Sequence, residues 1–263
     1  MQAQTLGITY IGGPTALLEL GGLRLLTDPT FDPPGGGYQT GPVTLHKIAG
    51  PAKSAESLGS IDIVLLSHDH HADNLDHAGR RLLGSVARVL TTEAGAARLG
   101  GNAIGLANWQ SLDVAAPNGR TLRITGTPAR HGPRFGDRGP VTGFVLSFVD
   151  APEDSLYISG DTVWYEGVAE VSRRFSIRTA VLFMGAARVW IVGPCPLTMT
   201  AEGAMQAAQV FPHARIVPLH YEDWEHFSES RGEIERIFCK HGLESRLHWI
   251  EKGETLHIPA SSS

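Results

Sequence analysis

The chain has 263 residues, of which 42% are hydrophobic and 19% are charged. This is the composition of an ordinary globular protein that can bury a sizeable core. Its formal net charge of −5 argues against a polyanion-binding surface, because nucleic-acid-binding proteins usually carry an excess of Lys and Arg. The two cysteines, Cys195 and Cys239, are too few for a disulfide framework or a cysteine-rich zinc site.

The N-terminal residues show no basic segment followed by an apolar run, and no apolar run approaches the roughly 20 residues that span a bilayer. We therefore expect a cytoplasmic protein without stable membrane insertion. No linker or repeat divides the chain, which predicts one domain over residues 1–263. We expect a small-molecule substrate and no nucleic-acid partner. The sequence leaves the oligomeric state open, including a homo-oligomer.

The first part of the chain predicts hairpins followed by a loop. Three short apolar runs are separated by Gly12-Gly13-Pro14 and by Gly21-Gly22, which are typical turn sequences. A loop rich in proline and glycine follows from residue 28 to about residue 41. The predicted strands are Thr5–Ile11, Ala16–Leu20 and Leu23–Thr27.

Beyond residue 60, buried strands alternate with helices. Two helices are predicted, Thr200–Val210, with Thr200 as its N-cap, and Ser228–Cys239. Early hairpins and later strand–helix alternation favour an α/β (α+β) protein in which helices cover a pair of mixed sheets, an αββα four-layer sandwich. The predicted strands are Ile61–Leu66, Val86–Thr91, Leu122–Thr125, Gly143–Val149, Ser155–Ser159, Ala180–Met184 and Arg215–Pro218.

Three histidines, His68, His70 and His71, crowd into four positions directly after the apolar run 61–66. A strand that ends in His-x-His places both imidazoles on one side, because side chains alternate with period two. With Asp73 just beyond, this pattern indicates a zinc- or manganese-binding edge. The alternative is a polar loop after a strand, but a tract this rich in histidine and aspartate is uncommon.

Three later strands also end in a histidine or an aspartate. The strand near residue 125 leads to His131, the strand near residue 157 leads to Asp161, and the strand near residue 217 leads to His220. Each residue alone is more often part of a loop or a helix cap. Together with the His68 tract they predict one site at an edge of the sheets.

The order His-x-His…Asp, then His, Gly-Asp-Thr and Leu-His-Tyr resembles the metallo-β-lactamase superfamily. It is most similar to the branch that includes ascorbate-6-phosphate lactonases and N-acyl-phosphatidylethanolamine phospholipases. The resemblance extends from about residue 6 to residue 257. Supporting matches are the runs Leu25-Leu26-Thr27-Asp28-Pro29 and Tyr221-Glu222-Asp223-Trp224-Glu225-His226-Phe227.

The resemblance implies an αββα fold and one or two Zn²⁺ or Mn²⁺ ions per chain. It also implies that a hydroxide between the metals is the nucleophile, its pKa lowered by coordination, and that an aspartate beside it, Asp73 or Asp161, orients it or takes up its proton. The implied ligands are His68, His70 and His131 for the first metal, Asp161 as a bridge, and Asp73 and His220 for the second.

The tract departs from the family pattern His-x-His-x-Asp-His, since residues 68–74 read His-Asp-His-His-Ala-Asp-Asn. Without a gap, Ala72 replaces the aspartate and Asp73 the final histidine. With one inserted residue, Asp73 keeps its role and Asn74 replaces the histidine. Both alignments cost the second metal an imidazole unless His71 replaces it. The second ion is then bound loosely or is a harder ion such as Mn²⁺.

Several further residues are candidates for substrate contacts. Arg134 is the first candidate among the arginines around His131, because arginine binds phosphate and carboxylate in a bidentate manner; the alternative is a solvated loop paired with Asp137. Trp164 and His226 are candidates for the pocket wall, against core and structural roles. Asp76 is predicted to hydrogen-bond a ligand histidine, and Asp28 either supports the site or caps its own turn.

These features predict a lactonase-like, metal-dependent hydrolase that activates water against an ester, lactone or phosphodiester bond. One alternative is an iron-dependent oxidoreductase on the same fold, although di-iron members carry a Glu where this chain has His71. The other is a non-catalytic member that binds metal or a small ligand, which the departures at Ala72 and Asn74 suggest.

Overall fold

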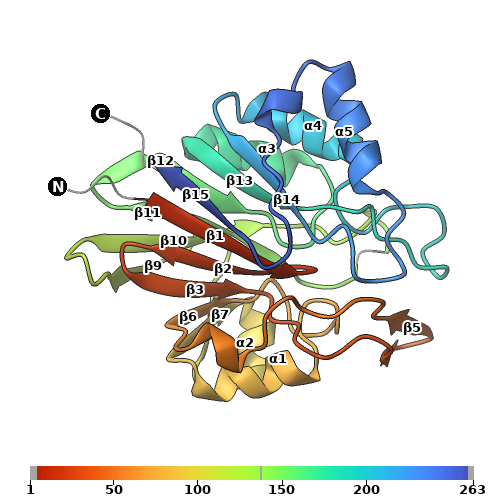
Figure 1. Ribbon diagram of the computed structural model, residues 1–263, viewed down its shortest axis with the longest axis horizontal. Coiled ribbons are helices and arrows are strands. Elements are labelled where there is room, and N and C mark those ends of the chain that lie inside the picture. The colour runs from red at the N-terminus through yellow and green to blue at the C-terminus, as the bar shows by residue number, and fades with distance from the viewer. Residues whose placement is uncertain (1–4, 137, 260–263) are drawn as a thin grey trace.

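A computed structural model of the chain describes residues 5–136 and 138–259, and Figure 1 shows two β-sheets packed face to face between two groups of helices. The first sheet has seven strands in the order β15-β1-β2-β3-β6-β7-β8. Their bounds are β1 Thr5–Gly12, β2 Thr15–Leu20, β3 Leu23–Thr27, β6 Ile63–Leu65, β7 Arg88–Thr91, β8 Ala103–Gly105 and β15 Thr255–Pro259.

The second sheet has six strands in the order β14-β13-β12-β11-β10-β9. Because β12, β13 and β14 are parallel and β11 is antiparallel to both β10 and β12, the strands β10, β12 and β14 all run in one direction. Their bounds are β9 Ser111–Ala115, β10 Thr121–Pro128, β11 Thr142–Phe148, β12 Ala151–Ile158, β13 Ile177–Phe183 and β14 Arg215–Leu219.

The helices form the two outer layers (Figure 1). Short helices α1 (His77–Leu82) and α2 (Glu93–Leu99) lie against the seven-stranded sheet, and three helices cover the six-stranded sheet. The latter are α3 (Glu166–Arg174), α4 (Ala201–Val210) and α5 (Arg231–Lys240). Single 3₁₀ turns occur at Glu56–Leu58, Leu83–Ser85 and Glu244–Arg246. No helix among the described residues is long and apolar enough to cross a bilayer.

The layers follow from the alternation of side chains along the strands. In β6, Ile63 and Leu65 point into the core between the sheets, whereas Val64 packs with the outer layer that holds α1. In β13, Val181 faces the central core and Leu182 faces α4. A strand buried on both faces reads as a continuous apolar run, so the sequence identifies these strands well.

All ten strands that the sequence predicts overlap observed strands, and both predicted helices are present. Thr200 caps α4 as predicted, since its side chain accepts a hydrogen bond from Gly203 N at 3.0 Å. The predicted αββα sandwich is therefore confirmed.

The prediction of a continuous loop over residues 28–41 is wrong in part. A separate two-stranded sheet pairs β4 (Gly37–Thr40) with β5 (Val43–His46). Each strand has four residues, too few for a clear alternation signal. Their pairing depends on distant contacts, because Tyr38, Val43 and Leu45 pack with residues of the 187–197 segment and with Trp224.

Candidate metal centre

The ends of four strands converge on one site. The tract 68–74 follows β6, while His131, Asp161 and His220 follow β10, β12 and β14. Those last three strands run in the same direction, so their C-terminal ends meet at one edge of the six-stranded sheet. The predicted assembly of the site from strand ends is therefore what the fold produces.

Asp28 holds the beginning of the tract in place. Its Oδ1 accepts hydrogen bonds from Ser67 N at 2.9 Å and from Ser67 Oγ at 2.6 Å. Ser67 Oγ in turn lies 2.9 Å from His68 Nδ1. Burial raises the pKa of Asp28 to about 8, against the lowering effect of the Ser67 hydrogen bond. Asp28 thus supports the site, as one of the two sequence interpretations proposed.

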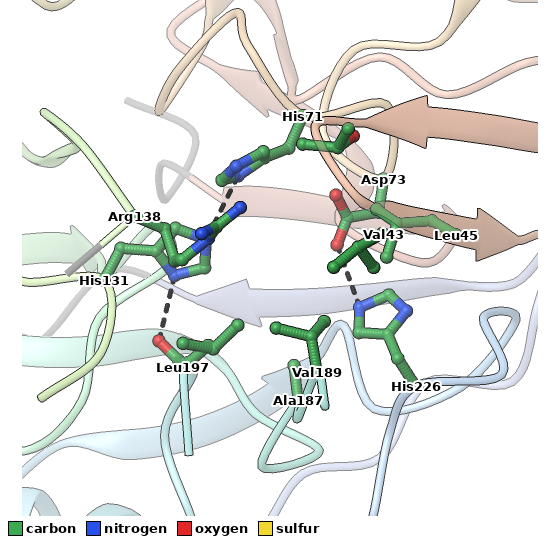
Figure 2. Close-up of a pocket in the computed structure, with 11 residues that line it drawn as sticks. Val43, Leu45, His71, Asp73, His131, Arg138, Ala187, Val189, Leu197 and His226 are labelled. Atoms are coloured by element: carbon green, nitrogen blue, oxygen red, sulfur yellow. Dashed lines mark hydrogen bonds and ion pairs between the residues drawn. The ribbon is translucent and has the colours of Figure 1, made fainter. Parts of the chain in front are cut away.

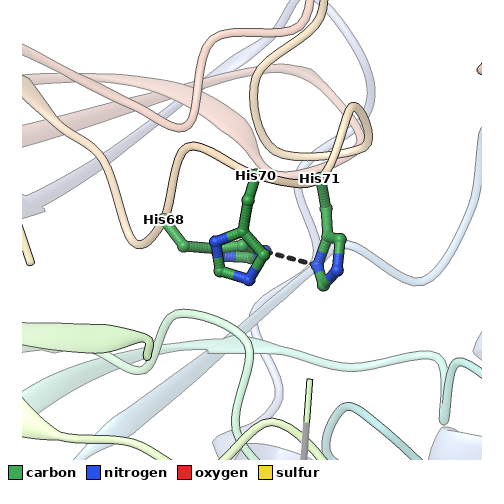
Figure 3. Close-up of side chains that lie close together, drawn as sticks. All are labelled: His68, His70 and His71. Atoms are coloured by element: carbon green, nitrogen blue, oxygen red, sulfur yellow. Dashed lines mark hydrogen bonds between the residues drawn. The ribbon is translucent and has the colours of Figure 1, made fainter. Parts of the chain in front are cut away.

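Four imidazoles form what we call the histidine group: His68, His70, His71 and His131. His71 Nδ1 lies 2.9 Å from His68 Nε2 and 3.2 Å from His131 Nε2, so three ring nitrogens converge. Figure 3 shows His68, His70 and His71 side by side. His131 Nδ1 donates to Leu197 O at 2.9 Å, and His70 Nε2 to Arg138 O at 2.8 Å.

Burial keeps His68, His71 and His131 neutral. It holds the pKa of His68 well below its ordinary value, with further lowering by His71 and His131. Burial and the neighbouring His131 also lower the pKa of His71 to about 3, and burial lowers that of His131. A neutral imidazole has a free lone pair, which is the form that binds a metal ion.

We call the second cluster the carboxylate group: Asp73, Asp161 and His220, all buried. His220 Nε2 lies 3.5 Å from Asp161 Oδ1 and 3.7 Å from Asp73 Oδ2, distances too long for good hydrogen bonds. Asn74 Nδ2 donates to Asp161 Oδ1 at 3.3 Å, and His226 Nε2 lies 3.1 Å from Asp73 Oδ2.

Local backbone geometry aims two of these side chains. His220 has a φ of 56°, which is uncommon for a residue other than glycine, and its N donates to Gly13 O at 2.9 Å. Asp161 follows Gly160, whose φ is 58° and where a Cβ would lie 2.6 Å from Thr142 O. Strained backbone of this kind often marks functional sites.

The carboxylate group carries more negative than positive charge. Burial opposes protonation of His220, yet Asp161 and Asp73 together raise its pKa to about 10. Conversely, the attraction of His220 outweighs burial and lowers the pKa of both Asp73 and Asp161. Two buried carboxylates therefore remain ionised and require positive charge beside them.

The donor atoms fit a metal ion. Among the described residues, buried atoms with no hydrogen-bond partner include Asp73 Oδ1, Asp161 Oδ2, His70 Nδ1 and His220 Nε2. Two donor triads, each with its atoms within 4.8 Å of one another, share Asp161. A third triad is formed by the three histidines of the tract. The triads are His68–His131–Asp161, Asp73–Asp161–His220 and His68–His70–His71.

A pocket opens onto both groups (Figure 2). Its lining includes five polar residues of the site: His71, Asp73, His131, Arg138 and His226. The rest of the lining is largely apolar and comes from the β4–β5 hairpin and the 187–197 segment: Thr40, Val43, Leu45, Ala187, Val189 and Leu197.

The structure brings all eight predicted metal candidates together, and it places His226 in the pocket lining. It places the other substrate candidates elsewhere: Arg134 is exposed and Trp164 packs against the cluster beneath α3–α5, and neither lines the pocket. Asp137, the predicted partner of the arginines, lies outside the described residues.

Contrary to the prediction, Asp76 forms no hydrogen bond with a ligand histidine among the described residues. It caps α1 through Gly79 N at 2.8 Å and also accepts from Asp32 N and Lys47 Nζ at 2.7 and 2.9 Å. The hydrogen bond between His131 and Leu197 O has no signal in the sequence. Of the arginines around His131 that the sequence offers as substrate contacts, Arg138 and not the first candidate Arg134 lines the pocket, because the direction of a loop side chain has no local signal.

Comparisons with known proteins identify the family of this chain. A family model described as a β-lactamase superfamily domain matches residues 23–221. The UPF0173 protein YddR of Bacillus subtilis is 26% identical over 259 residues, which cover 95% of this chain and 99% of that protein. A UPF0173 metal-dependent hydrolase of Pyrobaculum aerophilum is 25% identical over 219 residues, covering 81% and 83%.

Solved structures show the same architecture. An isothiocyanate hydrolase from Delia radicum gut bacteria superposes with a TM-score of 0.78 at 26% identity, covering 97% of this chain and all of that one. The chain thus belongs to the metallo-β-lactamase superfamily, as the sequence resemblance indicated, and is a metal-dependent hydrolase.

Proposed function

We propose that the chain hydrolyses an ester, lactone or phosphodiester bond of a small substrate, using zinc or manganese held by the histidine and carboxylate groups. The observation that carries the proposal is the position of Asp161. It is fully buried, belongs to a donor triad of each group, and has one oxygen, Oδ2, with no hydrogen-bond partner among the described residues. A single carboxylate shared by two donor sets is suited to bridge two ions.

His68, His70, His131 and Asp161 would hold one ion, and Asp73, Asp161 and His220 the other. Metal ions in such a site lower the pKa of water toward neutrality and polarise the substrate oxygen. The protein supplies orientation: Leu197 O fixes the His131 ring, and His226 holds Asp73 Oδ2. Such supporting hydrogen bonds set the tautomer and direction of the metal-binding side chains.

His71 is the additional donor of the histidine group in this proposal, and Asn74 is a support of the carboxylate group. His71 Nδ1 lies 2.9 and 3.2 Å from two other ring nitrogens, close to the separation of about 3.3 Å that two nitrogens take around tetrahedral zinc. Asn74 instead directs its amide nitrogen toward Asp161 Oδ1. The second ion is then held mainly by oxygen, which favours a harder ion such as Mn²⁺.

Isothiocyanates are a second candidate substrate class. The isothiocyanate hydrolase of known structure is similar to this chain over its whole length. The apolar wall formed by Val43, Leu45 and Val189 suits the hydrocarbon part of such a compound. In that reaction, water would add to the electrophilic carbon between nitrogen and sulfur.

Elemental analysis of protein purified without chelators tests the proposal, together with the variants His68→Ala and His220→Ala. We expect up to two equivalents of zinc or manganese, with each variant losing metal and activity. The activity panel contains an aryl ester, a lactone, a phosphodiester and benzyl isothiocyanate. Absence of metal in every preparation would overturn the proposal, and stoichiometric iron would favour the oxidoreductase alternative instead.

A further inference from the structure

We propose that Arg138 binds an anionic group of the substrate, whose apolar part packs against the apolar residues of the pocket lining. The substrate class is thus a small amphiphile that carries a carboxylate or phosphate beside a compact hydrocarbon group. This inference rests on the proposed function, since it places that anion next to the bond to be cleaved.

The backbone of Arg138 is tied directly to the metal centre. Its N donates to His131 O at 2.8 Å, and its O accepts from His70 Nε2 at 2.8 Å. The next residue, Gly139, has a φ of 105°, and a Cβ there would lie 3.0 Å from His70 Nε2. The segment therefore sits close against the histidine group, and the base of the Arg138 side chain is fixed relative to it.

The guanidinium of Arg138 has no carboxylate partner among the described residues, although it lines the pocket. Figure 2 shows the side chain beside His71 and His131. Other arginines of this chain form ion pairs, as Arg98 does with Asp69 and Arg123 with Asp113. A half-buried guanidinium without a partner, facing a ligand pocket, is suited to bind a planar or tetrahedral oxyanion through two hydrogen bonds.

The local charge favours an anion as well. Two divalent ions would bring four positive charges against the two carboxylates of Asp73 and Asp161, and Arg138 adds one more. Among the described residues, Asp73 is the only acidic one in the pocket lining. Positive charge in a confined site attracts anionic ligands.

The apolar part of the lining defines the rest of the substrate. Val43 and Leu45 come from β5, and Ala187, Val189 and Leu197 come from the segment between β13 and α4. These side chains offer no hydrogen bond, so they select hydrocarbon surface. The same pocket is lined by Arg138, by His71 and His131 of the histidine group and by Asp73 of the carboxylate group.

Binding of matched ligands tests the inference without requiring turnover. Isothermal titration calorimetry compares 4-methylpentanoate and 3-methylbutylphosphonate with the neutral 4-methylpentanamide, on the wild-type protein, Arg138→Gln and Arg134→Gln. Arg134 is the matched comparison, because it lies in the same loop but is exposed and outside the pocket lining. Metal content and circular dichroism of each variant report whether the site and fold are intact.

We expect Arg138→Gln to weaken binding of at least one anion about ten-fold or more, as loss of a charge-assisted hydrogen bond does, with the amide affected less than two-fold. Arg134→Gln should leave the affinities for the anions and for the amide unchanged. Equal loss for the anions and the amide, no loss in Arg138→Gln, a larger loss in Arg134→Gln, or no anion binding by the wild type at millimolar concentration would each overturn the inference. Because the assay measures binding alone, failure to find a hydrolysed bond would count against the proposed function and leave this result intact.

Discussion

The histidine group and the carboxylate group share Asp161, yet they are built and supported differently. The first consists of imidazoles, and burial lowers the pKa of three of them, His68, His71 and His131. The second consists of two ionised carboxylates around a histidine whose pKa they raise to about 10. Nitrogen donors suit zinc, and a site rich in oxygen suits harder ions. One centre can thus bind two ions with different preferences.

Two ion pairs near the tract 68–74 also differ in their exposure. Lys47 and Asp76 form a buried ion pair at 2.9 Å at the start of α1, two residues after Asn74. Beside the histidine group, Arg98 pairs with Asp69, but the Arg98 side chain is 47% exposed. The ion pair that follows Asp73 and Asn74 in the chain is therefore shielded from water, whereas the one at Asp69, between His68 and His70, is partly screened by solvent.

The largest effect is expected from Asp161→Asn, because that carboxylate serves both groups. Its loss should reduce kcat/KM by about three orders of magnitude, which corresponds to about 4 kcal/mol of transition-state stabilisation. Steady-state kinetics with parallel metal analysis measures this. Asp113→Asn, which changes an exposed aspartate on β9, is the control and should stay within two-fold of wild type. Activity of Asp161→Asn within ten-fold of wild type would show that no shared carboxylate is needed.

The next largest effect is expected from Lys47→Met. Removing one partner of a buried ion pair leaves an uncompensated charge and costs about 3–5 kcal/mol of unfolding free energy. Urea unfolding of the metal-free protein measures this cost. The double variant Lys47→Met/Asp76→Asn should recover part of it, because no charge then remains buried. A double variant less stable than Lys47→Met would mean that Asp76 acts through its cap on α1 and not through its charge.

A smaller effect distinguishes the donors of the two groups. His71→Ala should weaken binding of the ion at the histidine group about 10- to 100-fold, the range seen when a group that supports or completes a metal site is removed. Asn74→Ala should weaken binding only of the ion at the carboxylate group. Competition with a chromogenic chelator resolves the two affinities. If Asn74→Ala weakened both ions and His71→Ala neither, the roles assigned to these residues would be reversed.

The smallest effect is expected from Arg98→Met. Ion pairs with an exposed partner contribute about 1 kcal/mol or less, so urea unfolding should show a loss of that size. The loss should also shrink in high salt, whereas that of Lys47→Met should not. If Arg98→Met lost as much unfolding free energy as Lys47→Met, the expected difference between the exposed and the buried ion pair would be contradicted.

The strands and the main donors could be predicted from the sequence because their signals are local. Apolar runs identify strands buried on both faces, and His68, His131, Asp161 and His220 each follow such a run within a few residues. Parallel strand ends meet at one edge, so the convergence of these residues follows from the order of elements. The β4–β5 hairpin was missed because its short strands are held by contacts with residues more than 140 positions away.

The chain's own sequence determined which donor types exist and that an imidazole is missing from the family pattern, since residue identity and spacing are sufficient for both. Only the tertiary structure decided that His71 faces His68 and His131, that Asn74 faces Asp161, and that Arg138 rather than Arg134 reaches the pocket. Each of these directions depends on a loop. A loop lacks the regular periodicity of a strand, and its path is set by hydrogen bonds to distant segments, such as those of Arg138 with His131 and His70.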